Sequence, residues 1–409
     1  MAPVVVMKFG GTSVATEEGR QHIARKVSDE LSHGKRVVLV VSAMGRAGAP
    51  YATDTLLGLV SREHVSAHEL DILMSTGEII SAVVVSHELN RRGIAARALT
   101  GADAGILTDG HDGQAAIIGV DTRHLHALLE AGEVAVVAGF QGMDAEGLLK
   151  TLGRGGSDTS ACALAVALGA ERVDISTDVD GVYTADPRLV EDAQVLARIT
   201  AEELYQMASH GSKVVHEPAA QLALGSGVTM RVVNTFSDAP GTEVVSLERY
   251  RPDAVATAVS TVRDMSRLRL RLPYVKDDVQ AHMAAQTNVY RALACAGISI
   301  DMFTPMNDRV VFSIASADTE HAIAALKPLG LDLACRPHLG KLTLIGAGMH
   351  GVPGVMAQVA DCLAARGIDI LQVADSHATI SLLVDEGCLD DAARALHAAF
   401  GLADMAKRR

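Results

Sequence analysis

Two glycine-rich loops hold the residues best suited to binding an anion. In the first, KFGGTS, an apolar strand ends at Lys8 and is followed closely by Gly10 and Gly11. Adjacent glycines let backbone N–H groups approach a phosphate, and a lysine adds a compact positive charge. An ordinary glycine-rich turn is the competing interpretation, because the spacing GxxxxGK[ST] of a P-loop occurs nowhere in the chain.

The second loop, GRGGSDT at 153–159, stands directly before an apolar helix expected from Ser160 to Ala170. Arg154 can hold a carboxylate through two parallel hydrogen bonds. We expect Ser157 or Asp158 to cap the helix, whose N-terminus would offer N–H donors and the positive end of its dipole. Packing alone explains three glycines beside an arginine poorly, so we predict a ligand site here.

Three further segments carry polar groups in less distinctive patterns. STGE at 75–78 is expected to open an apolar helix that runs to about Leu89. Glu78 is then either a first-turn acid that the helix dipole stabilises or a site residue. The segment STDVDGVYTADPR at 176–188 joins a strand end to a turn-rich loop, a composition that ordinary turns also use. Ser212 and Lys213 add one more basic group.

The elements that must position these groups alternate between strands and helices. Apolar, Val-rich runs predict buried strands at 4–9, 36–42, 133–138 and 172–176. The residues Ile23, Val27 and Leu31 recur every fourth position and predict a surface helix over 16–33. Thr200 and Glu203 form a capping box, so a helix is expected to begin at Ala201. This alternation up to about residue 250 predicts a layered α/β domain.

The rest of the chain contains an internal repeat with a period of seventy residues. The segment Gly297–Ile300 falls on Gly367–Ile370, and the alternating run Val310–Ile314 falls on Ile380–Val384. We predict a βαββα-type unit used twice, either as a purely structural duplication or with a ligand in the seam between paired sheets. GAGMHG at 346–351 fits the dinucleotide signature GxGxxG, but about sixty residues follow it, too few for that fold.

Charge and composition exclude several classes of protein. The chain has 36 Lys and Arg against 49 Asp and Glu, a net charge of −13, and 3% aromatic residues, which disfavours nucleic acid as a partner. Five scattered cysteines without a CxxC pair favour a reducing cytoplasm. The longest apolar runs reach about half of the ~20 residues of a membrane helix. We therefore expect no membrane contact. His124 and His126 are spaced so that a helix points them apart, so we expect no metal-ligand set.

Taken together, five motifs resemble those of the aspartate kinases, of the amino-acid kinase superfamily. They are KFGGTSV at 8–14, VVSAMGR at 40–46, STGE at 75–78, TLGRGGSDTSA at 151–161 and TDVDGVYTADPR at 177–188. The resemblance covers essentially the whole chain. It implies an α/β fold: a three-layer α/β/α amino-acid-kinase-type domain at 1–250, then two ferredoxin-like (βαββαβ) ACT units at 265–332 and 335–409. By family analogy, a strand at 255–262 joins the second unit.

The resemblance also implies the reaction and its residues. ATP with Mg²⁺ would phosphorylate the β-carboxylate of L-aspartate, the first step of lysine, diaminopimelate, threonine and methionine biosynthesis. Lys8, oriented by Asp158 and flanked by the amides of Gly10 and Gly11, would meet the transferring phosphoryl group. The implied aspartate pocket is Thr53, Glu78 for the ammonium group, Arg154 for a carboxylate, and Ser157. The implied nucleotide positions are Lys8, Phe9, Gly10, Gly11, Ser42, Thr177, Asp178, Tyr183, Arg188, Ser212 and Lys213.

Regulation is implied by the ACT pair, with a homo-oligomer formed through ACT pairing. The effector would be diaminopimelate, lysine or threonine, and the segment 370–384 most resembles the diaminopimelate-responsive, Bacillus-like branch. The implied effector positions are Met349, Gly351, Val352, Pro353, Gly354, Asp375 and Ser376. The loop at 45–54 is extended by AGAPY, a departure that bears on the assignment of Thr53.

Two other functions remain open on the sequence alone. One is a kinase of the same fold with another acceptor, such as N-acetylglutamate or glutamate; an N-acetylated acceptor would leave Glu78 no ammonium group to meet. The other is a non-catalytic amino-acid sensor, against which the joint presence of Lys8, Arg154 and Asp158 argues.

Overall fold

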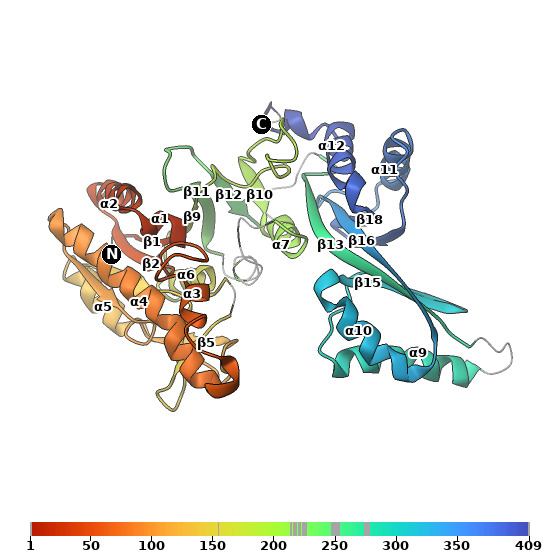
Figure 1. Cartoon of the computed structure of the whole chain (residues 1–409). Coiled ribbons are helices and arrows are strands. Elements are labelled where there is room, and N and C mark those ends of the chain that lie inside the picture. The colour runs from red at the N-terminus through yellow and green to blue at the C-terminus, as the bar shows by residue number, and fades with distance from the viewer. Residues whose placement is uncertain are drawn as a thin grey trace. The chain divides into compact units, whose positions relative to one another are not determined.

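The computed structural model describes residues 2–153, 155–212, 215, 219, 222, 227–246, 254–273 and 279–407 (Figure 1). The chain forms two compact units, each of which is described by itself. The first spans Met1–Val182, Val195–Ser209 and Lys213–Arg251. The second spans Tyr183–Gln194, His210–Ser212 and Pro252–Arg409.

An eight-stranded sheet, in the order β10-β12-β11-β9-β1-β2-β6-β3, forms the centre of the first unit. Its strands are β1 (Val4–Phe9), β2 (Arg36–Val41), β3 (Ala96–Leu99), β6 (Val134–Ala138), β9 (Arg172–Thr177), β10 (Arg198–Thr200), β11 (Thr229–Asn234) and β12 (Thr242–Val245). All described pairs are parallel except β11 with β12. The four strands expected from the sequence are confirmed, and their continuous apolar runs are typical of parallel strands buried on both faces.

Helices cover both faces of this sheet. They are α1 (Gly11–Ala15), α2 (Glu17–Ser32), α3 (Thr53–Leu57), α4 (Ala67–Arg91), α5 (Arg123–Glu130), α6 (Gly156–Ala167) and α7 (Ala201–Ser209), with the 3₁₀ turn η1 (Arg62–His64). Apolar residues of α2 and α4 share one core with Val5, Met7 and Phe9 of β1. Because side chains alternate along a strand, Val6 and Lys8 lie on the other face, where α6 packs against β1, β2 and β9. The three-layer arrangement is confirmed.

A capping box fixes the start of α4 and corrects one expectation. Ser66 accepts a hydrogen bond from the Glu69 N–H, and the Glu69 carboxylate accepts one from the Ser66 N–H. The helix therefore begins at Ala67, and Glu78 lies in its middle; the prediction that STGE opens this helix is wrong. The equivalent box predicted at Thr200 and Glu203 is confirmed at the start of α7.

By length and composition alone, α4 could cross a membrane. It nevertheless packs against β3 and β6 of the sheet and carries the buried carboxylates of Asp71, Glu78 and Glu88. These are the features of a core helix in a folded domain. Beside it, a four-stranded sheet in the order β5-β4-β7-β8 completes the first unit, from β4 (Ile106–Thr108), β5 (Ile117–Val120), β7 (Gln141–Met143) and β8 (Leu149–Thr151).

The second unit is built on a six-stranded antiparallel sheet, in the order β14-β15-β13-β16-β18-β17. Its strands are β13 (Ala258–Arg271), β14 (Phe303–Met306), β15 (Arg309–Ala315), β16 (Asp332–Ile345), β17 (Gln372–Asp375) and β18 (Thr379–Asp385). Its helices are α9 (Val279–Cys295), α10 (Thr319–Leu326), α11 (Val355–Ala364) and α12 (Leu389–Ala399), with the 3₁₀ segments η2 (Ser316–Asp318), η3 (Lys327–Leu329), η4 (Glu386–Cys388) and η5 (Leu402–Lys407).

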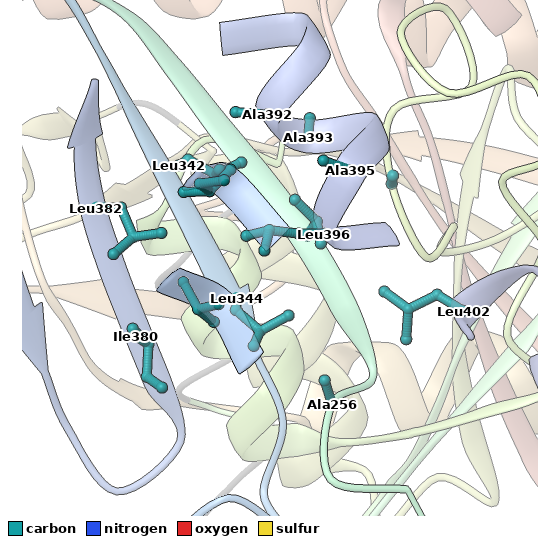
Figure 2. Close-up of a cluster of buried hydrophobic side chains, with 14 of the residues drawn as sticks. Ala256, Leu342, Leu344, Ile380, Leu382, Ala392, Ala393, Ala395, Leu396 and Leu402 are labelled. Carbon is teal, nitrogen blue, oxygen red and sulfur yellow. The ribbon is translucent and has the colours of Figure 1, made fainter. Parts of the chain in front are cut away.

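The seventy-residue repeat reappears in this unit as matching local geometry. Gly297 and Gly367 follow α9 and α11 with the same φ of 67°. The next residue in each repeat, Ile298 or Ile368, donates a backbone hydrogen bond to a leucine carbonyl of the preceding helix. The apolar residues that match between β15 and β18 are all buried, and each repeat has its own apolar core (Figure 2 shows that of the second repeat).

Strands β13 and β16 run through both repeats. The later part of β13 pairs with β15, whereas Ala258–Val262 pairs with Lys341–Ile345 of β16. The first repeat therefore reads β13-α9-β14-β15-α10-β16, and in the second repeat the beginning of β13 supplies the fourth strand. This is the ferredoxin-like βαββαβ order used twice.

Candidate active site

A cavity of about 1130 Å³ lies in the first unit at the carboxyl edge of the central strands. Its lining comes from the segments that follow β1, β2 and β9, from α4, and from the start of α6. The paired ends of these strands explain the convergence, because Phe9 is in register with both Val41 and Ser176. Ligands of open parallel sheets bind at this edge.

Lys8 and Asp158 form an ion pair in this cavity, with 2.6 Å between Nζ and Oδ1. The side chains are 13% and 9% exposed, so the pair is largely withdrawn from water. Lys8 is the penultimate residue of β1, and Asp158 lies in the first turn of α6. Both side chains line the cavity, where the Lys8 ammonium group is available to an anion.

Gly11, the second glycine after Lys8, is required by close approach. A Cβ atom on Gly11 would lie 2.5 Å from the Ala43 carbonyl oxygen and 2.6 Å from that of Gly45. Gly10 and Gly11 both line the cavity beside Lys8. The side chain of Phe9 points the other way, into the core shared with α2 and α4, so only its backbone faces this edge.

The second glycine-rich loop begins α6 differently from the expected way. Gly155, with a φ of 71°, occupies the N-cap position, and no side chain caps the helix. Ser157 and Asp158 lie inside the first turn, so the prediction that one of them caps a helix starting at Ser160 is wrong. The reason is that Gly155 adopts a left-handed conformation at no steric cost, which lets the helix begin at Gly156. Arg154 lies outside the described residues.

Glu78 is the most unusual ionisable group of the cavity. Its side chain is 3% exposed, and Oε1 accepts a hydrogen bond of 3.1 Å from the Ala43 N–H. Its other oxygen, Oε2, is buried without a hydrogen-bond partner in the described part of the chain. Burial raises the pKa of Glu78 to about 8, although the hydrogen bond from Ala43 acts in the opposite direction. A buried carboxylate of this kind is suited to meet a cation.

The neighbouring glycine fixes the loop that follows β2. A Cβ atom on Gly77 would lie 2.7 Å from the Tyr51 carbonyl oxygen and 2.8 Å from the Ala43 Cβ. The extended loop therefore packs directly on α4. It leads to Thr53, the first residue of α3, which lines the cavity with Ser42 and Ser157.

Thr177 and Asp178, two of the expected nucleotide residues, line the cavity at the end of β9. Thr177 ends β9, and its hydroxyl accepts a hydrogen bond from the Val179 N–H. Asp178 pairs with Arg46 at 2.7 Å. Tyr183, Arg188 and Ser212 belong to the second unit. Lys213 lies outside the described residues.

Arg46 and Asp71 also line the cavity, although the sequence did not indicate either of them as a site residue. Arg46 is the last residue of the VVSAMGR motif and donates a hydrogen bond to the Asp178 carboxylate. Its signal in the sequence is its place in that motif, shortly after the end of β2. Asp71 is fully buried, accepts hydrogen bonds from the Gly113 N–H and the Thr151 hydroxyl, and thereby fastens β8 to α4. Its signal is the spacing of seven residues, two helical turns, before Glu78.

The expected effector residues surround one end of the second repeat. Met349 is buried in its core, whereas Val352 is exposed. Gly354 is the N-cap of α11, and the Ser376 hydroxyl lies 2.7 Å from that of Thr379. The two segments meet through His350 and His377, whose Nδ1 atoms are 3.0 Å apart. The remaining positions are Gly351, Pro353 and Asp375; Asp375 ends β17.

The chain is similar to known proteins along nearly its whole length. Residues 3–234 match the model of the amino acid kinase family, and residues 335–398 match that of an ACT domain. Aspartokinase 1 of Bacillus subtilis (strain 168) is 42% identical over 408 residues, covering 98% of this chain and 99% of the relative. The aspartokinase of Geobacillus stearothermophilus is 37% identical over 414 residues, covering 98% of each.

Two solved structures are similar to this chain along nearly its whole length. E. coli aspartokinase III in complex with aspartate and ADP (R-state) matches with a TM-score of 0.78 at 26% identity, over 97% of this chain and 100% of that one. The same enzyme in complex with lysine and aspartate (T-state) matches with a TM-score of 0.77 at 25% identity, over 97% and 99%. These similarities confirm the fold class expected from the sequence.

The Glu78 carboxyl predicts a pH-dependent stability difference. Its folded pKa of about 8 exceeds the ordinary 4.5, so the folded chain holds the proton more tightly and the contribution of Glu78 to stability falls as pH rises from 4.5 to 8. The variant Glu78→Gln cannot ionise. We expect its melting temperature to match that of the unsubstituted protein near pH 5 and to exceed it increasingly up to pH 8. Calorimetry across this range measures it; the exposed Glu63→Gln is the control, and parallel curves for Glu78→Gln would contradict the expectation.

Proposed function

The chain belongs to the amino acid kinase family and, within it, to the aspartokinases, and from this premise we propose that it transfers the γ-phosphoryl group of ATP to the β-carboxylate of L-aspartate. The products are 4-phospho-L-aspartate and ADP. One observation carries the assignment: a single cavity holds a lysine fixed by an aspartate and a buried glutamate oxygen that lacks a partner among the described residues.

The acceptor explains why the cavity needs no general base. A carboxylate with a pKa near ~4 is already ionised at pH 7 and can attack phosphorus directly. Phosphoryl transfer then depends on positioning and on stabilising charge at the transferring group. Lys8 supplies that charge, and Asp158 fixes the position of the Lys8 ammonium group. The backbone N–H groups of Gly10 and Gly11 lie in the same cavity lining and can approach the phosphate oxygens.

The aspartate substrate carries a positive charge that suits Glu78. The α-ammonium group would approach the unpartnered Oε2, and the proton held by the carboxyl group would leave as the ion pair forms. Thr53 and Ser157 supply hydroxyl groups to the same pocket, and Arg154 supplies the guanidinium group for a carboxylate. N-acetylglutamate lacks the ammonium group, so the buried Glu78 disfavours it as the acceptor.

ATP would bind across Ser42, Thr177 and Asp178, together with Tyr183, Arg188, Ser212 and Lys213. Within the described ranges, no three His, Cys, Asp or Glu side chains gather in a metal-holding group. Mg²⁺ usually keeps several waters and is bound through the substrate's phosphates. When bound, Mg²⁺ neutralises phosphate charge. The protein's own contribution there is the carboxylate of Asp178 and the charge of Lys8.

The ACT repeats are proposed to regulate the kinase in response to an amino acid in a homo-oligomer. The two segments joined by His350 and His377 carry the proposed effector residues, and diaminopimelate is our first choice of effector, ahead of lysine and threonine. Differential affinity for two quaternary states would give the inhibition. All five cysteines are free, which suits a reducing cytoplasm.

An acyl-phosphate assay tests the reaction. With ATP, Mg²⁺ and hydroxylamine, we expect hydroxamate from aspartate and none from glutamate or N-acetylglutamate. Lys8→Ala should lower kcat by roughly 10²–10³, as the loss of a charge-stabilising donor does, while aspartate still binds by calorimetry. The exposed Lys327→Ala is the control. No hydroxamate from a folded, ATP-binding protein would reject the function, and full activity of Lys8→Ala would reject the mechanism.

The same assay identifies the effector. Diaminopimelate should suppress hydroxamate formation, whereas equal concentrations of lysine or threonine should leave it unchanged. Suppression by lysine or threonine alone would retain ACT regulation and overturn the choice of diaminopimelate. If none of the three acts, the proposed regulation fails.

Glu78 also predicts proton release on aspartate binding. With a pKa of about 8, the carboxyl group is about 0.9 protonated at pH 7 and about half protonated at pH 8. Binding an ammonium group ionises it, so about 0.9 proton should leave at pH 7 and about 0.5 at pH 8. Calorimetry in buffers of different ionisation enthalpy counts these protons. An unchanged count between the two pH values would show that Glu78 does not meet the ammonium group.

A further inference from the structure

His397, near the end of α12, is fully buried within the second unit. Its Nε2 atom lies 2.9 Å from the hydroxyl oxygen of Thr184. The nearest carboxylate, that of Asp192, is 3.7 Å from Nδ1, and this nitrogen makes no hydrogen bond with any described residue. Burying a polar imidazole ring costs free energy when one of its nitrogens has no hydrogen bond, so packing alone does not explain this residue.

The partner of His397 closes a loop at 184–194, which we call the strap. Thr184 donates its N–H to the Gln194 carbonyl oxygen, and its hydroxyl oxygen accepts the Gln194 N–H at 2.9 Å. The Thr184 carbonyl oxygen accepts a third hydrogen bond, of 2.8 Å, from the N–H of Val259 in β13. Thr184 thus ties the two ends of the strap together and attaches them to the ACT sheet.

Apolar and polar contacts hold the rest of the strap on the same repeat. Ala185, Val190 and Ala193 belong to the core cluster that includes Ala392 and Leu396 of α12 (Figure 2 shows the latter two). Arg394, three residues before His397, donates a hydrogen bond of 3.1 Å to the Leu189 carbonyl oxygen. One helix of the second ACT repeat therefore contacts the strap at its closure, in its core and at its outer turn.

The strap carries residues that the proposed function assigns to ATP. Tyr183 directly precedes it, and Arg188 lies on its outer turn with an exposed guanidinium group that pairs with Asp186 at 2.6 Å. The Asp186 carboxylate also accepts a hydrogen bond from the backbone N–H of Arg188. The backbone carbonyl oxygen of Asp186 accepts hydrogen bonds from the N–H groups of Leu189 and Val190. The direction of Arg188 thus depends on how the strap is held.

We propose that His397 is a positioning residue for the nucleotide: its bond to Thr184 holds the strap so that Tyr183 and Arg188 are presented to ATP. This rests on the proposed function, in which both residues bind ATP. A neutral ring suits the role, since burial lowers the pKa of His397 and keeps one ring nitrogen free to accept the Thr184 hydroxyl proton.

Two neutral substitutions separate positioning from packing. In His397→Gln the side-chain amide reaches where Nε2 lay, whereas in His397→Asn it ends near the position of Nδ1 and cannot reach Thr184. We expect His397→Asn to raise the KM for ATP roughly three- to tenfold, the factor of one lost buried hydrogen bond, with the KM for aspartate unchanged. His397→Gln should restore most of the loss. Ala398→Ser, a neutral substitution at an exposed position of the same helix, is the matched control.

Thr184→Val provides an independent arm. It should raise the KM for ATP in the same way, and combining it with His397→Asn should add little, because both remove one interaction. If His397→Asn does not fold, Thr184→Val and His397→Gln decide. An unchanged KM for ATP in folded variants, or an equal rise in the KM for aspartate, would overturn the inference while the unsubstituted protein still makes hydroxamate. Absence of hydroxamate from the unsubstituted protein would instead reject the proposed function.

Discussion

The ion pair between Lys8 and Asp158 is the constraint on which the cavity depends. Taking both charges largely out of water costs free energy that their attraction only partly recovers, so the pair is a poor stabiliser of the fold. Its contribution is to fix the position of the Lys8 ammonium group. It requires the end of β1 and the first turn of α6 to meet at one edge of the sheet, with glycines where the backbones come close. Glu78 lies in the same cavity, but its Oε2 accepts no hydrogen bond within the described segments, and burial raises the pKa of its carboxyl group. The Asp158 carboxylate pairs with Lys8, whereas the Glu78 carboxyl group is the one that the proposed function assigns to the substrate's ammonium group.

Much of this cavity could be predicted, because its motifs directly follow recognisable strands. β1, β2 and β9 are continuous apolar runs, and the residues after them are Gly10, Ser42 and Asp178. Parallel strands bring their carboxyl ends to one edge, so three separate stretches of sequence imply one site. The start of α4 could not be read as easily. Apolar residues surround much of this helix, so periodicity does not locate its first turn, and the deciding signal is the local exchange of hydrogen bonds between Ser66 and Glu69.

The assignment of the strap to the second unit could not be predicted either, for a different reason. Its apolar residues, Ala185, Val190 and Ala193, are small and few, and they follow a motif that reads as part of the kinase domain. The surface that buries them is α12, about two hundred residues later in the chain. Local propensity carries no information about such a distant partner, and a single hydrogen bond between Thr184 and His397 leaves no periodic signature. The repeat was visible because it recurs at a fixed period, whereas the strap occurs once.

Comparing the two copies of the repeat shows how the copy that contacts the strap differs from the other. A shift of seventy residues aligns Leu396 with Leu326, both buried in their own cores, and aligns His397 with Lys327. Lys327 begins η3 and is exposed, so the first repeat offers solvent a flexible cation where the second buries an imidazole against Thr184. Because β13 and β16 run through both copies, a change in one repeat acts on strands that also complete the other. The two copies thus share a sheet, but this position contacts the strap in the second copy and faces solvent in the first.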